Sequence, residues 1–173
     1  MIEALKPVLI YTDGACIGNP GPGGYGVVLI YGDHRKELSA GFRLTTNNRM
    51  EIMAAIVGLQ ALKQKCEVTI FTDSQYLIDT IMKGWAQRWK SNNWMRNKKD
   101  KAINTDLWSQ MLELCSLHIV TFKWVRGHSG IPENERCDQL AVKAAQSKPL
   151  LIDFAYESLN FPLPVIKEKA LFD

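Results

Sequence analysis

Two stretches of the sequence end in an aspartate in the same local context: VLIYTDG, residues 8 to 14, and VTIFTDS, residues 68 to 74. Each is an apolar run that leads through an aromatic residue and a threonine to Asp13 or Asp73. If the two runs are neighbouring parallel strands, about 4.8 Å apart, the two carboxylates converge. Such carboxylates repel each other and raise one pKa unless a cation compensates. The repetition favours a cation site, although either aspartate alone could be a turn residue or a helix cap.

Three further residues could take part in the same chemistry. Glu51, in TTNNRMEIMAA, follows Asn48 by three positions, so it is either a capping-box partner or a carboxylate aimed at the strand ends. His128 lies in a Gly-His-Ser-Gly loop just before a segment with helical spacing that carries Asp138. A loop histidine is often a plain surface residue and a helical aspartate often faces water. Position along the chain leaves these alternatives open.

A glycine-rich stretch, Gly21 to Gly26, matches the pattern G-x-G-x-x-G of dinucleotide-binding loops. In those loops the last glycine opens a helix, whose N-terminal amides hold the phosphates. Here GVVLIYG follows, which is β-branched and has no helical period, and Pro20 and Pro22 remove backbone donors. We interpret the stretch as a glycine-rich hairpin connection, which excludes a dinucleotide-dependent oxidoreductase.

The hydrophobic pattern predicts the elements that must position these residues. Strands are expected over about 8–11, 25–31, 36–44, 66–72 and 118–125, and helices over about 48–62, 74–82 and 107–115 and from 132 onward. Three strands with tight turns predict an antiparallel meander, and the later alternation of strand and helix predicts parallel pairing. The expected fold class is α/β, a mixed sheet of about five strands with helices on its faces.

Composition and charge limit the number of domains, the cellular location and the kinds of partner that we expect. With 173 residues and 46% hydrophobic content, the chain suits one compact domain. No signal peptide is apparent and no apolar run approaches the ~20 residues that span a bilayer, so we expect a soluble cytoplasmic protein with no membrane partner. The four cysteines are scattered and are expected to be free thiols. A net charge of +3 permits an anionic partner without requiring one.

The motifs around Asp13, Glu51, Asp73, His128 and Asp138 together resemble ribonuclease H of type 1, the bacterial ribonuclease HI. The resemblance runs in order from about residue 8 to residue 145. It implies a ribonuclease H-like fold, a five-stranded mixed sheet whose first three strands are antiparallel. It also implies a hydrolase that cleaves the RNA strand of RNA/DNA hybrids endonucleolytically, with little sequence specificity, and leaves 5′-phosphate and 3′-hydroxyl ends.

By this resemblance, catalysis uses two Mg²⁺ ions, with Mn²⁺ as a substitute. Asp13 bridges both ions, Glu51 and Asp73 hold one, and Asp138 holds the other. His128 shuttles a proton or assists product release, and an ordinary histidine pKa near 6.5 suits that role. Mg²⁺ prefers oxygen ligands, which fits a small set of carboxylates.

The resemblance also implies substrate contacts. Residues expected near the minor groove of the hybrid are Cys16, Asn19, Asn47 and Gln75. Those expected to hold a phosphate of the DNA strand are Asn19, Thr46 and Asn104. Such contacts read the backbone and the 2′-hydroxyl rather than the bases, so sequence preference should be weak.

The segment 83–101 is basic and rich in tryptophan, and it resembles the basic handle of bacterial ribonuclease HI. Its expected substrate-binding residues are Trp85, Arg88, Lys90, Lys98 and Lys99. An alternative is that Trp85 and Trp89 are packing residues and that the lysines only solvate a loop. Where the family often has a run of Lys and Arg, this chain has Ser91-Asn92-Asn93, so hybrid affinity is expected to be weaker or to depend on residues 96–101.

Residues 1–147 are expected to form the catalytic domain and residues 148–173 a C-terminal extension. The extension has no clear period, so it is either packed on the domain or a tail that binds replication proteins through its Leu171-Phe172 end. We expect a monomer. Two other functions share some of these features: a non-catalytic hybrid-binding module, which could lack the acids, and a transposase or resolvase, for which the handle and the His128 loop are not expected.

Overall fold

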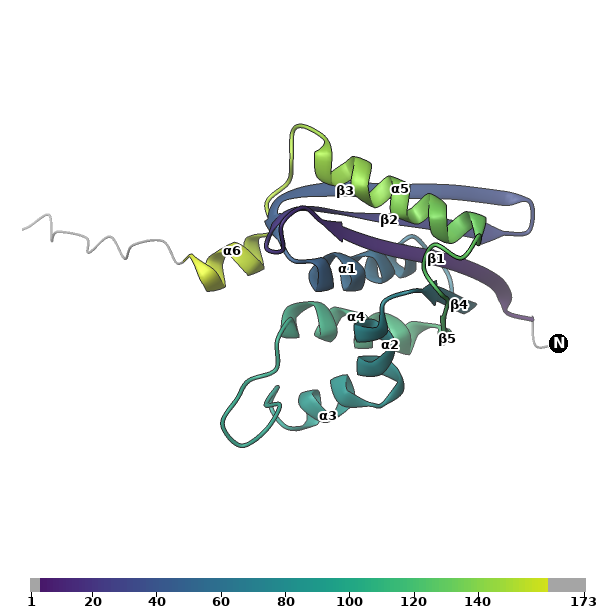
Figure 1. The fold of residues 1–173 in the computed structure, drawn as a ribbon. Helices are drawn as coiled ribbons and strands as arrows, with labels where there is room; N and C mark the ends of the chain where they lie inside the picture. Colours follow the sequence, from purple (N-terminus) through teal and green to yellow (C-terminus); the bar gives the residue numbers. More distant parts are fainter. Residues whose placement is uncertain (1–3, 162–173) are drawn as a thin grey trace, which may run out of the picture.

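The computed structural model describes residues 4–161. Five strands form one sheet in the spatial order β3-β2-β1-β4-β5 (Figure 1). The strands are β1 (Lys6–Cys16), β2 (Gly21–Tyr31), β3 (His34–Thr45), β4 (Cys66–Thr72) and β5 (Ile119–Trp124). β1, β2 and β3 pair antiparallel, whereas β4 pairs parallel with both β1 and β5. The predicted mixed sheet is confirmed.

Helices cover both faces of the sheet. They are α1 (Asn47–Gln60), α2 (Gln75–Met82), α3 (Trp85–Ser91), α4 (Thr105–Leu117), α5 (Pro132–Gln146) and α6 (Phe154–Asn160). In Figure 1, α5 lies over one face, α1 and α4 lie below the other, and α3 with the loop after it lies farthest from the sheet. Within residues 4–161, no helix combines the length and the apolar composition needed to cross a membrane.

The main hydrophobic core lies between the sheet and α1 and α4. Ile10 and Ile70 from neighbouring strands, Ile52 and Leu59 from α1, and Trp108 from α4 are fully buried in it. Burying such side chains contributes roughly 1.5–3 kcal/mol each, so this core holds β1, β4 and α1 firmly against one another. These three elements carry or precede the candidate acidic residues.

The first strands are longer than the sequence pattern indicates. The predicted strand over 8–11 extends to Lys6–Cys16, because β1 is central and has hydrogen-bonding partners on both sides. Thr12, Asp13 and Gly14 have the composition of a turn, but they continue the ladder opposite residues 25–27 of β2. Tertiary pairing overrides a weak local preference here.

The prediction of a hairpin connection at Gly21–Gly26 is wrong. These glycines lie inside β2, and the turn is made by residues 17–20 just before them. A Cβ at Gly24 would lie 2.5 Å from the carbonyl oxygen of Ala141, and one at Gly26 would meet the backbone of Cys137. The glycines therefore let α5 lie directly on the sheet, which is a packing role rather than a turn role.

The chain after α5 returns to the edge of the sheet. The Leu151 amide donates to the Gly41 carbonyl at 2.8 Å, and the Arg43 amide donates to the Leu151 carbonyl at 2.9 Å. Asp153 then caps α6 by accepting from the Tyr156 amide. The sequence did not predict α6, because its seven residues show no apolar period. The Leu171-Phe172 end lies outside the described residues.

Candidate active site

Asp13 and Asp73 lie at the same edge of the sheet. β1 and β4 are parallel with Thr12 opposite Thr72, so each aspartate occupies the next position of its own chain. The predicted strand pairing is confirmed, and it places the two carboxylates at the carboxyl ends of adjacent strands. The Asp73 carbonyl also accepts from the Trp124 indole N–H at 3.2 Å, which ties this strand end to β5.

Glu51 joins them from the first turn of α1. Thr46 is the N-cap of this helix, and its side chain accepts from the Arg49 amide at 3.2 Å. The capping-box alternative for Glu51 requires Asn48 as the N-cap. It is therefore wrong, because the N-cap is Thr46, two residues earlier. Gly14 allows the approach: a Cβ there would lie 2.5 Å from the Glu51 nitrogen.

The three carboxylates form a tight, largely buried group. One oxygen from each of Asp13, Glu51 and Asp73 lies within 4.8 Å of the others. Burial, followed by the charge of Asp73, raises the pKa of Asp13 to about 7. Burial, followed by the charges of Asp13 and Asp73, raises the pKa of Glu51 well above its ordinary value. Both shifts have the cause expected of like charges held together away from water.

This group has the chemistry of a metal site. The Glu51 Oε2 atom is buried and has no hydrogen-bond partner among the described residues. An orphaned acceptor of this kind is costly unless something supplies positive charge. A hard divalent cation, which takes oxygen ligands, would both satisfy this atom and relieve the repulsion. The residues present therefore fit a metal ion.

Asp138 approaches the group from α5, on the opposite face of the sheet from α1. It is half-buried, and its charge contributes to raising the pKa of Asp13, although its oxygens are not within the tight group. Asn134 lies one turn earlier on the same face of α5 and is 2% exposed, with a buried Oδ1 that also has no partner among the described residues. Sequence reasoning missed Asn134, although its spacing of four from Asp138 was available.

The loop between β5 and α5 carries His128 and passes beside Asp73. His128 is exposed, with a φ of 53°, a conformation that non-glycine residues seldom adopt. The preceding residue, Gly127, touches the site directly, since a Cβ there would lie 2.6 Å from Asp73 Oδ2. The Gly130 amide donates to Glu135 on α5, which anchors the far side of the loop. Sequence reasoning also missed Gly127, whose close contact only the fold reveals.

A second group of predicted residues lines one cavity beside the start of α1. This cavity, of about 790 Å³, includes Asn19, Thr46 and Asn104. The Asn47 amide donates to Asn19 Oδ1 at 3.1 Å, which joins the β1–β2 turn to the start of α1. Asn104 accepts from Arg49 and donates to the Tyr76 hydroxyl, so its side chain is held in place. The structure thus brings together residues from three distant parts of the chain.

Two predicted contacts are placed differently. The Cys16 thiol is half-buried and faces the carbonyl oxygens of Gly21 and Thr45 at 3.5 Å. Gln75, the first residue of α2, is exposed and donates to Asp79 one turn later at 2.9 Å. Cys16 therefore presents mainly its backbone and its sulfur atom to a substrate. The exposed Gln75 side chain can exchange its hydrogen bond with Asp79 for one with a substrate.

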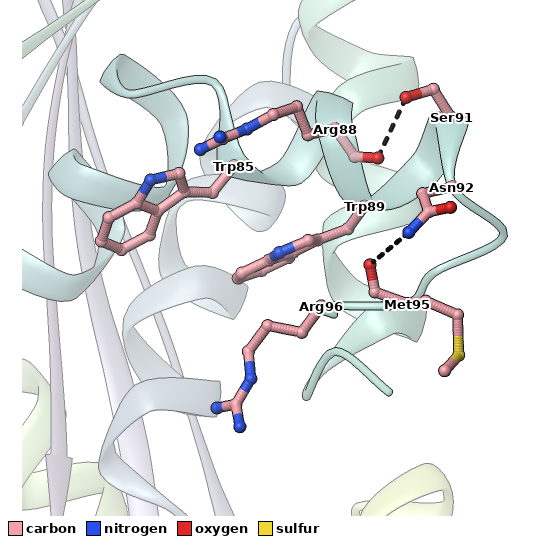
Figure 2. Close-up of a pocket in the computed structure, with 7 residues that line it drawn as sticks. All are labelled: Trp85, Arg88, Trp89, Ser91, Asn92, Met95 and Arg96. Atoms are coloured by element: carbon pink, nitrogen blue, oxygen red, sulfur yellow. Dashed lines mark hydrogen bonds between the residues drawn. The ribbon is translucent and has the colours of Figure 1, made fainter. Parts of the chain in front are cut away.

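The basic segment forms a projecting element with its own cavity of about 530 Å³. Figure 2 shows the indole rings of Trp85 and Trp89 and the guanidinium group of Arg96 on the same side of it. The two ring centroids are 6.5 Å apart. Trp89 is also partly packed against the main core, so it both supports the segment and faces the cavity. Arg88 and Lys90 are exposed on the same helix.

The loop after α3 is held by its own hydrogen bonds. Ser91 donates to the Arg88 carbonyl and Asn92 to the Met95 carbonyl (Figure 2), so the uncharged run Ser91-Asn92-Asn93 ends the helix and shapes the cavity. Asn97 Oδ1 accepts from the amides of both Lys99 and Asp100 at 2.8 Å. Lys98 and Lys99 therefore sit exposed on a formed turn.

Buried carboxylates at the carboxyl edge of a mixed sheet, in a chain that also has a basic projecting element, are the combination expected of a metal-dependent enzyme that hydrolyses phosphodiesters. The chain belongs to the ribonuclease H family, because the family model described as RNase H matches residues 5–146. It is similar to the Ribonuclease H of Syntrophus aciditrophicus (strain SB), at 66% identity over 151 residues that cover 87% of each chain. It is also similar to the Ribonuclease HI of Synechocystis sp. (strain ATCC 27184 / PCC 6803 / Kazusa), at 59% identity, covering 88% of this chain and 96% of the relative.

Solved structures share the fold. LC9-RNase H1, described as a type 1 RNase H with the type 2 active-site motif, aligns with a TM-score of 0.73 at 32% identity, covering 92% of this chain and 83% of that one. LC11-RNase H1, solved in complex with RNA/DNA hybrid, aligns with a TM-score of 0.62 at 26% identity, covering 80% and 96%. The family resemblance expected from the motifs is confirmed.

Proposed function

We propose that this protein is an endonuclease that hydrolyses the RNA strand of RNA/DNA hybrids with little sequence preference. The single observation that carries the proposal is the convergence of Asp13, Glu51 and Asp73, with oxygens within 4.8 Å of one another and one buried oxygen unpartnered. The hybrid-bound state of a structural relative supports the choice of substrate. A non-catalytic binding module would not need to hold like charges together at this cost.

We propose Mg²⁺ as the metal, with Mn²⁺ as a substitute, because the ligand set consists of oxygens only. Asp13, Glu51 and Asp73 would hold it, and Asp138 would contribute from α5. Bound divalent ions at such a site supply an activated water and stabilise charge on the reacting phosphate and the leaving oxygen. Asp13 is central to the arrangement, because it lies beside Gly14 and Glu51 on one side and Asp73 on the other.

Proton movement is assigned to His128. It follows Gly127, the residue of the loop that adjoins the Asp73 carboxylate, and it is open to solvent. We propose that it moves a proton between the leaving group and water, and that product exchange takes place on this open side.

Substrate binding is assigned to two surfaces. The cavity lined by Asn19, Thr46 and Asn104 would hold a phosphate of the DNA strand, with Cys16, Asn47 and Gln75 facing the minor groove, where the 2′-hydroxyl identifies RNA. The projecting element would bind the backbone farther along through the residues predicted from the sequence: Trp85, Arg88, Lys90, Lys98 and Lys99. These contacts are electrostatic or stacking contacts, so they carry little sequence information.

The last part of the proposal concerns the domain organisation of the chain. We propose residues 1–147 as the catalytic domain and the following segment as an extension. We further propose that the protein acts as a cytoplasmic monomer. An interaction of the C-terminal end with replication proteins remains a prediction.

The test is a cleavage assay on four labelled substrates: three duplexes of 20 base pairs and one single-stranded RNA of 20 nucleotides. RNA/DNA hybrid should be cut on the RNA strand only when Mg²⁺ is present, while RNA/RNA and DNA/DNA duplexes and single-stranded RNA stay intact. Asp73→Asn, which preserves shape but removes the charge, should lose cleavage while its thermal unfolding is unchanged or raised, because repulsion is relieved. Metal-dependent cleavage by Asp73→Asn, or equal cutting of RNA/RNA, would contradict the proposal.

A further inference from the structure

Helix α6 forms part of the wall of the cavity that is assigned above to a phosphate of the DNA strand. It contributes Tyr156, Leu159 and Asn160, and it lies near the end of β3, where the chain leads into α1 (Figure 1). None of these three residues is among the substrate contacts expected from the sequence. The cavity volume of about 790 Å³ falls in the range of roughly 300–1,000 Å³ that holds small molecules, so there is room for a sugar as well as a phosphate.

Two ion pairs fasten α6 to the rest of the domain. The N-cap Asp153 pairs with Arg49 at 2.7 Å, and Glu157, four positions later, pairs with Arg43 at 3.0 Å. Residues four apart lie on the same face of a helix, so this face of α6 is turned toward β3 and the start of α1. The pair with Arg49 is almost fully buried, and breaking it would leave an uncompensated charge, so the start of α6 is firmly held.

A second face of α6 is left for the cavity. Tyr156, Leu159 and Asn160 are three or four positions apart, so they share this face. Tyr156 is half-buried, whereas Leu159 is 79% exposed. An apolar side chain with most of its surface in water gains free energy when an apolar group of a ligand covers it. The cavity therefore has an apolar contact point on a helix whose position is fixed.

The rest of the cavity supplies polar groups and a positive charge. Asn48, Thr105 and Lys101 line it together with the residues already assigned to the phosphate, and no aspartate or glutamate is found among its lining residues in the described part of the chain. Within residues 4–161, Lys101 forms no ion pair. These groups suit a phosphate. In a nucleotide held by its phosphate, the attached sugar is the group that can reach Leu159.

We propose that Leu159 on α6 contacts a deoxyribose of the DNA strand and discriminates against a ribose at that nucleotide, an inference that rests on the proposed function. The 2′ carbon of deoxyribose carries only hydrogens, which pack on an apolar side chain. A ribose would bring a 2′-hydroxyl against Leu159, where it would lose water without gaining a hydrogen bond from that side chain. An RNA/RNA duplex has ribose on both strands, so this contact would help to exclude it.

The test measures binding of fluorescein-labelled 20-base-pair hybrids to the full chain by fluorescence anisotropy, in the Asp73→Asn background. In each hybrid, one deoxynucleotide of the DNA strand is replaced by a ribonucleotide, and the replacement is moved along the strand. We expect it to weaken binding roughly three-fold or more at one or two adjacent positions, because a hydroxyl is left unpaired there. Leu159→Ser should abolish the loss at those positions, whereas Leu159→Met, which keeps an apolar side chain, should retain it.

Leu117→Ser is the matched control. Leu117 is 55% exposed and lies at the end of α4, twelve residues and about 18 Å along the helix from Thr105, which lines the cavity. This variant should show the same position dependence as the chain without it. Cleavage of the unmodified hybrid by the parent chain is measured separately, so a failure of the proposed function can be distinguished from a failure of this inference.

Three results would overturn the proposal. The first is binding that is insensitive to the ribonucleotide at every position of the DNA strand. The second is an unchanged position dependence in Leu159→Ser, which would mean that the loss arises from contacts elsewhere. The third is loss of the position dependence in Leu159→Met or Leu117→Ser as well, which would mean that it does not depend on an apolar side chain at this point of α6.

Discussion

At the scale of single residues, the carboxylates acquire their properties from neighbours that are distant in sequence. The pKa of Asp13 rises to about 7 because of burial and because Asp73, sixty positions later, places its charge nearby. Asp73 itself is bounded by Gly127, whose missing side chain leaves room for the carboxylate. A substitution at Gly127 can therefore change the orientation of the Asp73 carboxylate without replacing any of the acidic residues.

Gly127→Ala should demonstrate this. The added Cβ would lie 2.6 Å from Asp73 Oδ2, and because this atom is the end of a side chain, the carboxylate would turn away at a stability cost below about 1 kcal/mol. Since displacements near 1 Å can cost on the order of 100-fold in rate, we expect hybrid cleavage to fall at least ten-fold and to require more metal. Cleavage rates across a metal titration, with urea unfolding alongside, make the measurement.

Gly32→Ala provides the control for this substitution. Gly32 lies in the β2–β3 turn with a φ of 55° and with nothing near its Cβ position. Alanine there should lower stability without affecting cleavage. Full activity of Gly127→Ala would show that the loop does not set the Asp73 orientation.

At the scale of elements, one buried arginine joins α1, α4 and α6. Arg49 is 2% exposed and pairs with Asp106 and Asp153, each at 2.7 Å. Burial opposes its charged form, but the hydrogen bonds that it donates to Asp106 and Asp153 raise its pKa overall. Thr45 also donates to Asp153 at 2.7 Å, so the extension after α5 is fastened to the end of β3 and the start of α1. Arg49 precedes Glu51 by two residues, and the network therefore also supports the helix turn that carries the carboxylate.

Asp106→Asn should reveal this network through the pH dependence of stability. Burial favours the neutral form of Asp106, but its hydrogen bond with Arg49 outweighs this and lowers its pKa below the ordinary value. The folded state therefore binds fewer protons than the unfolded state, so the stabilisation is present above about pH 4 and is lost as the pH falls through the folded pKa. We expect the variant to lose about 2 kcal/mol of unfolding free energy at pH 7 and much less at pH 3.

Urea unfolding at the two pH values measures this difference. Asp33→Asn, in the exposed β2–β3 turn, is the matched control and should change stability by less than about 0.5 kcal/mol at either pH. An Asp106→Asn deficit that stays constant between pH 7 and pH 3 would mean that the charge of this residue does not stabilise the fold.

At the scale of the whole molecule, the proposed function involves two separate regions. The carboxylates lie at the carboxyl ends of the central strands, and the element formed by α3 and its loop projects from the helices below the sheet (Figure 1). The projecting element has an internally hydrogen-bonded turn that presents Lys98 and Lys99. Its charges can therefore be changed without loss of its shape.

Lys98→Gln combined with Lys99→Gln should weaken hybrid binding and reduce its dependence on salt. Each phosphate contact contributes about 0.9 to the slope of log K against log salt concentration, so the slope should fall by about 2 if each lysine contacts one phosphate. Binding is best measured by anisotropy from 50 to 200 mM salt in the Asp73→Asn background, which prevents cleavage. Lys143→Gln combined with Lys148→Gln removes the same charge elsewhere, and an equal slope change in both double variants would exclude a specific role for the projecting element.

Much of the architecture could be predicted from the sequence, because apolar period and turn composition are local properties. The order of the strands, the convergence expected of Asp13 and Asp73 if their strands pair in parallel, and the helix carrying Asp138 all follow from such patterns. The resemblance to the ribonuclease H family rests on motifs that are each continuous in the chain. Short segments with no period, such as α6, could not be predicted, because a cap and a buried ion pair stabilise them rather than an apolar face.

The sequence by itself therefore determined the family, the fold class and the residues able to carry the chemistry. Only the tertiary structure decided which face of α1 presents Glu51, why Gly24 and Gly26 lie under α5, and why Gly127 adjoins Asp73. The physical reason is the same in each case. Burial, charge repulsion and close approach depend on distances between atoms, and folding sets those distances between residues that no local pattern connects.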